Sequence, residues 1–367
     1  MENAAKVTVL LPVYNSEKYI AQCLDSIQAQ TFTHWDMLIL NEFGSHKACT
    51  KILRSYARRD PRIQVVQNTT RLGLAESLNA GMKMARGEYI ARMDADDLAH
   101  PERFEKEVAY MEAHPNTAVL GSYQHHFGAE IDWIHKPPTD QEQCKANMLF
   151  FCDLCHSTLM LRKKTFLENN LFYDNHFMAE DFELWSRVIS HGDIVNLPQV
   201  LGEYRVGEDN ITAAKKDRLH LESGMLVART LKRTLDLELD PKRYYLFNNW
   251  RNDFAGIKDR EKRAAAYEEL KETLIQIYEA NQAVKFFEER ALLRAIRAKW
   301  AWAYAGEPFN RMVDVVNNDI NSIFKMKYSN LTLNRFYYFW KDNKGFLKKV
   351  KKVVKKTKEL FEHGEES

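Results

Sequence analysis

Three aspartates at the end of a short apolar run are the first candidates for chemistry. Asp94, Asp96 and Asp97 follow the run Tyr89-Ile90-Ala91. Like charges this close repel one another unless a cation or strong hydrogen-bond donors occupy the site. Alternation along an extended chain points Asp94 and Asp96 the same way, which suits one hard divalent ion. We expect Mg²⁺ or Mn²⁺ bridging a diphosphate here, with helix capping and turn formation as the alternative.

The elements that carry this motif belong to an alternating α/β pattern. From residue 7 to about 120, short apolar runs at 7–13, 36–40, 63–66 and 88–93 alternate with amphipathic stretches, which is typical of βαβ units in a parallel sheet. Because ligands of such sheets bind beyond the carboxyl ends of the strands, the loops 12–15, 41–45 and 94–97 are expected at one edge.

The helices between these runs have recognisable apolar faces and ends. Ser16 is expected to cap a helix with its apolar face from Tyr19 to Ile27, and a second helix runs through Ile52, Leu53 and Tyr56. A third carries Leu74, Leu78, Met82 and Ala85, and Gly87 is expected to end it in a left-handed conformation. Pro101 is expected to begin the helix after the aspartates and to lead into Phe104, Val108 and Met111.

The second half of the chain has a weaker pattern. A β segment is expected at 157–162 and a helix from Glu180 to about Ser190, ended by Gly192, while 216–335 is expected to be mostly helical. We therefore predict an α/β domain at 1–212, a helical C-terminal region at 213–335 and a basic tail at 336–367.

Composition and charge narrow the class of protein. With 367 residues, 45% hydrophobic and 28% charged, the chain suits a folded enzyme. The net charge of +2 hides a local excess at 341–360, where nine lysines face Asp342 and Glu359, so a general nucleic-acid binder is not expected. The apolar segment at 7–11 lacks a basic leader and a cleavage site, so we expect a first strand there and no export signal, and no run reaches the roughly 18 apolar residues of a spanning helix. The expectation is a cytoplasmic protein.

The five cysteines are odd in number and irregularly spaced, which favours free thiols in a reducing compartment. Cys152-Asp153-Leu154-Cys155-His156 matches a haem attachment pattern, but that chemistry follows export. A zinc site lacks a second pair of ligands at suitable spacing.

A set of ordered motifs resembles family 2 glycosyltransferases, which have the GT-A fold. The motifs cover roughly residues 5 to 212 and are Val9-Leu10-Leu11-Pro12-Val13-Tyr14-Asn15, Gln30-Thr31-Phe32, Arg71-Leu72-Gly73-Leu74-Ala75, Leu78-Asn79-Ala80-Gly81, Arg86-Gly87-Glu88-Tyr89-Ile90, Asp94-Ala95-Asp96-Asp97 and Glu180-Asp181-Phe182-Glu183-Leu184-Trp185. The resemblance rests on their order and spacing more than on any one of them.

The resemblance implies roles on the donor side. Asp94-Ala95-Asp96 would bind the nucleotide-sugar, with Asp94 near the ribose and diphosphate and Asp96 as the principal metal ligand. The metal would neutralise the departing diphosphate. Asp181 stands at the position of the catalytic base, with Glu180 as the second choice, which implies a single displacement with inversion.

The nucleotide contacts depart from the family pattern. Glu42 and Phe43 stand where relatives have two aspartates, and Glu42 keeps a carboxylate that can accept from a uracil N–H. Pro12 and Tyr14 would lie on the donor loop, with Tyr14 beside the base, and Arg71 would pair with base or phosphate oxygens; packing and a solvated charge are the alternatives for Tyr14 and Arg71.

The acceptor side carries two further departures. His156 opens a segment that in relatives lies beside the acceptor, although Ser157 stands where proline is usual. Gly207 stands where many relatives have a histidine near the metal, which leaves Glu208 or Asp209 as substitutes. The chain lacks the Gln-x-x-Arg-Trp motif of processive members, so we expect one sugar per encounter.

The tail and the substrates complete the expectations. Residues 344–361 have the pattern of a basic amphipathic helix on an anionic membrane, or of one docked on protein, and a peripheral position would suit a glycan or lipid-linked acceptor. The resemblance implies UDP-hexose or UDP-N-acetylhexosamine as donor in cell-surface polysaccharide synthesis. An inactive binding or assembly subunit and a nucleotidyltransferase are the alternatives, and an oligomer stays open.

Overall fold

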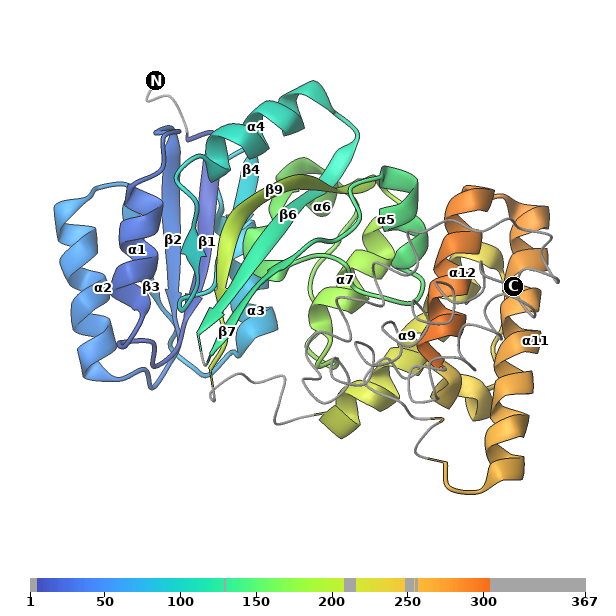
Figure 1. Ribbon diagram of the computed structural model, residues 1–367. Coiled ribbons are helices and arrows are strands. Elements are labelled where there is room, and N and C mark those ends of the chain that lie inside the picture. The colour runs from blue at the N-terminus through green and yellow to red at the C-terminus, as the bar shows by residue number, and fades with distance from the viewer. Residues whose placement is uncertain (1–4, 129, 208–215, 248–253, 255–256, 304–367) are drawn as a thin grey trace, which may run out of the picture. The chain divides into compact units, whose positions relative to one another are not determined.

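The computed structural model describes residues 5–128, 130–207, 216–247, 254 and 257–303 (Figure 1). The chain forms two compact units, 1–295 and 296–367, and the second is described only at 296–303. The predicted tail, and with it Glu208 and Asp209, lies outside the described residues. All the described strands belong to the first unit.

One mixed sheet organises this unit. Its strands are β1 Val7–Val13, β2 Trp35–Asn41, β3 Ile63–Gln67, β4 Tyr89–Arg92, β5 Leu98–Ala99, β6 Thr117–Gly128, β7 Ile131–His135, β8 Met160–Arg162 and β9 Asp193–Arg205. Their order is β3-β2-β1-β4-β8-β6-β9-β5, with β7 on β6. Strands β3, β2, β1 and β4 pair in parallel, and β8 runs against both β4 and β6.

Helices pack against this sheet, and further helices follow its last strand in the sequence. They are α1 Ile20–Gln28, α2 Lys47–Arg59, α3 Leu74–Met84, α4 Arg103–Ala113, α5 Gln141–Asn147, α6 Lys163–Glu168, α7 Glu180–Val188, α9 Lys216–Leu235, α11 Arg260–Val284 and α12 Glu289–Ala303, with 3₁₀ turns η1 His156–Thr158 and η2 Pro241–Phe247. No helix among the described residues is long and apolar enough to span a membrane.

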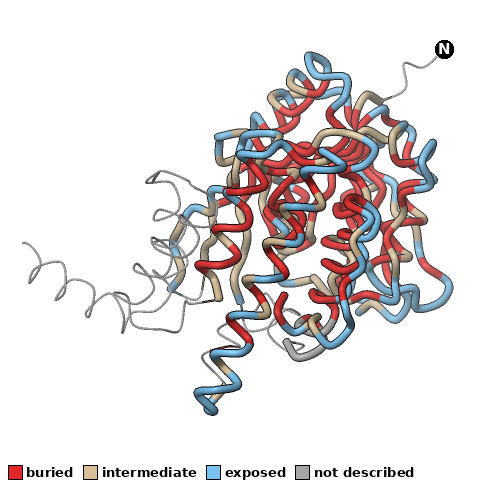
Figure 2. The backbone as a smooth tube through the Cα atoms, turned by 90° about the vertical axis from the view of Figure 1, so that its right-hand side faces the viewer, coloured by how far each residue is buried: buried red, intermediate tan, exposed pale blue. Residues whose placement is uncertain are grey.

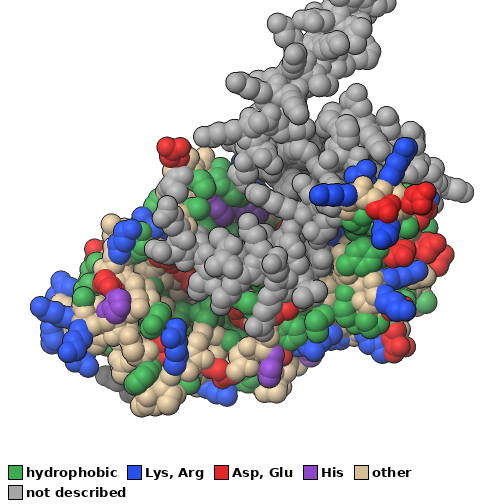
Figure 3. Space-filling view, turned by 90° about the horizontal axis from the view of Figure 1, so that it is seen from below, with side chains coloured by type: hydrophobic (Ala, Val, Ile, Leu, Met, Phe, Trp, Pro, Cys, Tyr) green, Lys and Arg blue, Asp and Glu red, His purple; other side chains and the backbone are tan. Residues whose placement is uncertain are grey.

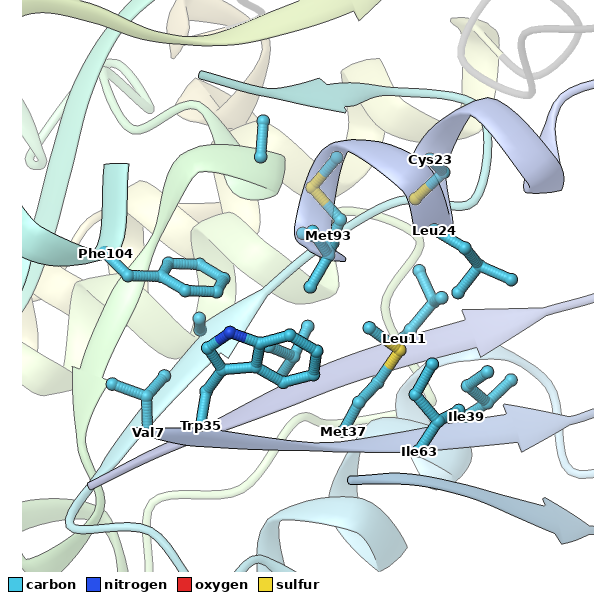
Figure 4. Packing of buried hydrophobic residues seen from close by; sticks show 14 of the residues in the cluster. Val7, Leu11, Cys23, Leu24, Trp35, Met37, Ile39, Ile63, Met93 and Phe104 are labelled. Carbon is cyan, nitrogen blue, oxygen red and sulfur yellow. The ribbon is translucent and has the colours of Figure 1, made fainter. Parts of the chain in front are cut away.

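The core lies on both faces of the parallel strands, which explains their continuous apolar runs. Trp35 and Met37 point from β2 toward α1, whose Leu24 belongs to the same buried cluster (Figure 4). On the opposite face α3 comes so close that a Cβ at Gly81 would lie 2.1 Å from Leu10 Cδ1. Figure 2 shows the buried residues concentrated in the interior, with exposed residues at the outer turns.

All four predicted strands of the first half are confirmed, and so are the helices on their apolar faces. Their ends differ in detail. Ser16 does not cap α1 with its side chain, because its hydroxyl donates to the carbonyl of Tyr14. Helix α4 begins at Arg103 and not at Pro101. Pro101 lies in the turn before the helix, and its carbonyl accepts a hydrogen bond from the amide of Thr31.

Gly87 is needed for space, and the prediction of a left-handed φ there was wrong. Its φ is not positive, but a Cβ would lie 2.5 Å from the backbone nitrogen of Thr8. The expected β segment at 157–162 is a strand only from Met160, because His156–Thr158 forms a 3₁₀ turn.

The helical region after residue 216 is confirmed over the residues described. Its first helix packs beside α7, where Glu222 of α9 accepts hydrogen bonds from the amides of Met178 (2.6 Å) and Ala179 (3.2 Å). Arg233 of the same helix donates to the carbonyl of Ser186. The domain boundary near 212 stays a prediction.

Candidate active site

The parallel strands place the three predicted loops at one edge of the sheet. Strand β6 runs parallel to β1, and its arrow points downward in Figure 1, so the carboxyl ends of these strands lie toward the bottom of that view. Figure 3 shows the molecule from below. The first two loops touch directly: the amide of Glu42 donates to the Val13 carbonyl at 2.9 Å, and that of His46 donates to Asn15 Oδ1 at 2.9 Å.

The aspartate loop between β4 and β5 is held by its backbone. Cys23 Sγ donates to the Asp94 carbonyl at 3.2 Å, and Arg205 Nε donates to the Asp96 carbonyl at 3.0 Å. The Arg205 amide also donates to Asp97 Oδ1 at 2.9 Å. Asp97 is therefore a structural anchor at 1% exposure, while Asp94 and Asp96 are only half-buried and Ala95 is buried between them.

Among the described residues, only Arg92 forms an ion pair with one of these carboxylates. Its side chain is 2% exposed and forms a short ion pair with Asp94, while its Nε has no hydrogen-bond partner among the described residues. Burial, the largest single effect, lowers the pKa of this guanidinium, but the charge and hydrogen bond of Asp94, with the charges of Tyr173 and Asp97, together raise it. Arg92 is thus a fixed buried positive charge at the end of β4.

The loop nevertheless carries more negative charge than Arg92 balances. Burial first, and then the Asp94 charge, raise the pKa of Asp96, and the same causes raise that of Asp97 well above its usual range. Ser157 and the Arg205 amide offset only part of this rise at Asp97. Carboxylate oxygens with surplus charge fit a hard divalent cation, although no third ligand joins Asp94 and Asp96 among the described side chains.

The second acidic pair starts helix α7. Asp181 Oδ1 accepts from the amide of Phe182 at 2.6 Å. Burial raises the pKa of Asp181, and burial together with the Asp181 charge raises that of Glu180 to about 8. Arg92 and Asp94 act electrostatically on both carboxyls, so the structure brings the two predicted acidic sites together.

His156 sits in the same neighbourhood but is neutral. Its Nε2 lies 2.9 Å from Tyr173 Oη, and burial, assisted by the Arg92 charge, holds its pKa well below the usual range. Asn79 of α3 fixes the Tyr173 backbone, donating to its carbonyl and accepting from its amide at 2.8 Å each.

Glu42 is buried and accepts several backbone hydrogen bonds, which its sequence position did not predict. It is 7% exposed. Its Oε1 accepts from the amides of Phe43 (2.8 Å) and Leu72 (3.1 Å), and its Oε2 accepts from that of Gly73 at 2.6 Å. These bonds hold its pKa below the usual range despite burial. Glu42 therefore fixes the turn that carries Arg71.

Tyr14 and Arg71, both predicted to bind the nucleotide-sugar donor, lie side by side. The Arg71 guanidinium carbon is 4.8 Å from the Tyr14 ring centre, and both side chains are exposed, Tyr14 by 43%. Pro12 is half-buried within β1, and Phe43 and Gly207 are exposed. Sequence reasoning thus missed Arg92, Tyr173 and Glu222; only Arg92 left a signal, as a charge inside a buried strand that must find a partner.

Residues 8–187 match the protein family described as glycosyl transferase family 2. The chain is 33% identical over 221 residues to an uncharacterized glycosyltransferase of Haemophilus influenzae, covering 56% of this chain and 67% of that protein. It is 31% identical over 244 residues to the putative glycosyltransferase EpsE of Bacillus subtilis, covering 64% and 84%. This chain belongs to glycosyl transferase family 2.

A more distant relative and a solved structure extend the comparison. WfgD of Escherichia coli, a UDP-Glc:alpha-D-GlcNAc-diphosphoundecaprenol beta-1,3-glucosyltransferase, is 26% identical over 211 residues, covering 57% of this chain and 80% of WfgD. Staphylococcus aureus TarS 1–349 in complex with UDP-GlcNAc superposes with a TM-score of 0.55 at 18% identity, covering 88% of this chain and 93% of TarS. The GT-A fold and a glycosyltransferase activity, both expected from the motifs, are confirmed.

Proposed function

We propose that this family 2 enzyme transfers one hexose or N-acetylhexosamine from a UDP-sugar to a glycan or lipid-linked acceptor in cell-surface polysaccharide synthesis, with inversion. The observation that carries the proposal is the convergence of Asp94, Asp96 and Asp181 around one buried cation, Arg92. The donor and acceptor named for WfgD, and the UDP-GlcNAc bound to TarS, support the substrate classes.

The donor would lie along the edge formed by β1, β2 and β4. Tyr14 and Arg71 flank the base and phosphates, with Pro12 and Ala95 contributing loop backbone. Glu42 Oε2 accepts a hydrogen bond from the Gly73 amide and keeps capacity for one more, which suits a uracil N–H.

The residues present suit a divalent cation. Asp96, with Asp94 beside it, would hold Mn²⁺ or Mg²⁺ by carboxylate oxygens, and their unbalanced charge favours such an ion. When bound, the ion supplies positive charge to the departing diphosphate, an effect worth several kcal/mol.

Asp181 is the base in this mechanism. Glu180, with a pKa of about 8, holds its proton at neutral pH, so Asp181, on which the Arg92 charge acts favourably, is the carboxylate left to serve as base. Asp181 takes the proton of the acceptor hydroxyl while that oxygen bonds to the anomeric carbon. The bond from this carbon to the diphosphate breaks on the opposite face, UDP leaves, and the configuration inverts.

An inactive family member is the alternative, suggested by the exposed Phe43 and by Gly207. Thermal shift with UDP-glucose and UDP-N-acetylglucosamine, with and without Mn²⁺, separates the two, because a ligand that binds only the folded chain raises its melting temperature. We expect a Mn²⁺-dependent rise, and UDP release that Asp96→Ala and Asp181→Ala abolish. Equal UDP release by the wild type and both variants would refute these roles.

We also propose that the enzyme works on the cytoplasmic side of the membrane. None of the five cysteines, all of which lie in the described part of the chain, forms a disulfide, as a reducing compartment favours. The basic tail pattern at 344–361 would bind anionic lipid. Cosedimentation with anionic vesicles should be lost in a chain truncated after Arg335, and equal binding by both chains would reject a membrane role for the tail.

A further inference from the structure

Four ring side chains gather on the strands β6, β7 and β9, outside the residues assigned to the donor, the metal and the base. The His126 ring centre lies 4.4 Å from that of Trp133, 4.9 Å from that of Tyr204 and 5.9 Å from that of His135. Trp133 and His135 meet edge to face at 5.6 Å. We call these four residues the ring cluster; all four are half-buried.

Strand pairing explains why the rings meet. His126 of β6 stands opposite Trp133 of β7 and Tyr204 of β9, and Gln124 stands opposite His135. Directly paired residues project from the same face of a sheet. The alternate residues face the other way, where Arg205 stacks on Tyr19 and Phe127 beside α1. The ring cluster therefore lies on the face opposite α1.

That face adjoins the predicted acceptor segment. Gln124 Nε2 donates to Ser157 Oγ at 2.8 Å. A Cβ at Gly202 would lie 2.6 Å from Thr158 Cγ2, so the turn that begins at His156 packs directly on this face.

The ring cluster also adjoins the carboxylates. Tyr204 precedes Arg205, whose amide and guanidinium hold the Asp94–Asp97 loop. Burial, and then the charges of Asp97, Asp94 and Asp96, raise the pKa of Tyr204 to about 12. In the strand order, Tyr14 and Glu42 lie at β1 and β2, the aspartates follow β4, and the ring cluster comes beyond them on β6 and β9.

We propose that the ring cluster is the subsite that holds a pyranose ring of the acceptor, stacked on Trp133 and hydrogen-bonded to His126. The inference deepens the proposed function and rests on it. Because the donor is assigned to β1, β2 and β4, the far side of the aspartate loop is where an acceptor saccharide would reach the anomeric carbon.

The chemistry of the cluster suits a sugar. A pyranose presents a face of C–H groups to a π system and hydroxyls at its rim, so it needs an aromatic surface edged by polar atoms. His126 Nε2 is buried and has no hydrogen-bond partner among the described residues. Such an atom costs stability in the free protein, and a sugar hydroxyl would satisfy it.

The experiment is saturation-transfer NMR on the full chain with UDP and Mn²⁺. The probes are the methyl β-pyranosides of glucose, galactose and N-acetylglucosamine. We expect saturation of the ring protons of at least one probe, reduced about fivefold or more in Trp133→Ala and largely kept in Trp133→Phe. Ile134→Ala is the matched control, because Ile134 is the next residue of β7, points to the other face and is 38% exposed.

UDP binding is measured by thermal shift on the same samples. It reports on folding and on the donor site independently of the glycoside signal. Unchanged UDP binding with lost glycoside saturation in Trp133→Ala supports the subsite. Equal saturation in Trp133→Ala and wild type, or none from any probe in the wild type, overturns it. Glycoside binding that depends on Trp133 in a protein that does not bind UDP would reject the proposed donor and leave the sugar site standing.

Discussion

The guanidinium of Arg92 and the carboxylate of Asp94 form an ion pair at the carboxyl end of β4, and the two partners differ in solvent access. Arg92 is 2% exposed and Asp94 30%. Arg92 therefore acts as a fixed counter-charge inside the protein, while Asp94 can still reach a ligand. Because the same guanidinium acts on Asp181 and Glu180, one buried cation links Asp94 to the two carboxyls of α7.

Removing the Arg92 charge should leave the Asp94 carboxylate without its positive partner. We expect Arg92→Met to lower the free energy of unfolding at pH 7 by about 2 kcal/mol, which is less than for a fully buried pair because water still reaches Asp94. Asp94→Asn in the same chain should recover part of that loss. Urea unfolding of the single and double variants measures the coupling, and exposed Arg86→Met serves as control. Strictly additive losses would argue against the pair.

The two carboxyls of α7 should respond differently to neutral substitution. Asp181→Asn removes the proposed base, so we expect UDP release to fall by about 10² to 10⁴. Glu180→Gln should cost less than about tenfold at pH 7, because a carboxyl with a pKa of about 8 is already largely protonated there. Steady-state UDP release at pH 7 compares them. A larger loss in Glu180→Gln would exchange the two roles.

Asp96 should stabilise the liganded enzyme and destabilise the free one. Its raised pKa means that its charge is disfavoured in the folded chain without metal. We therefore expect Asp96→Asn to raise the melting temperature of metal-free protein while abolishing the Mn²⁺-dependent rise with UDP-N-acetylglucosamine. Scans with EDTA and with Mn²⁺ separate these effects. A variant that keeps the Mn²⁺-dependent rise would remove Asp96 from the metal site.

Much of the first half could be predicted because its signals are local. Strands β1, β2 and β4 are mostly apolar runs, and Asp94, Asp96 and Asp181 stand beside element ends that the pattern locates. Strands β6, β7 and β9 escaped prediction, since their outer parts mix histidine, glutamine and aromatic residues without a clean alternation.

The supporting contacts could not be predicted because they are distant in sequence. Asn79 meets Tyr173 across 94 positions, and Arg205 meets Asp97 across 108. Glu42 lies in the loop after β2, and that it fixes the Leu72–Gly73 turn follows only from the fold.

Glu42 should act mainly through that turn. Glu42→Ala frees the amides of Phe43, Leu72 and Gly73, so we expect about 1 to 3 kcal/mol less stability and faster hydrogen exchange at Leu72 and Gly73. Asn41→Ala, a neighbouring buried change that leaves these three amides paired, is the control for general destabilisation. If exchange at Leu72 and Gly73 is equally fast in both variants, Glu42 does not hold the turn specifically.

His126 should make the stability of the fold sensitive to acid. Burial, followed by the neighbouring His135 and His125 charges, lowers its pKa to about 4, whereas the same imidazole in the unfolded chain titrates near 6.5. Between these values the unfolded chain binds a proton that the folded chain does not, so stability falls as the pH falls through this window. From pH 7 to pH 5, wild type should lose about 1 kcal/mol more than His126→Phe, a figure that allows for the partial exposure of the ring. Urea unfolding at both pH values measures the difference. Parallel losses in the two proteins would mean that this imidazole takes up its proton as readily in the folded chain as in the unfolded one.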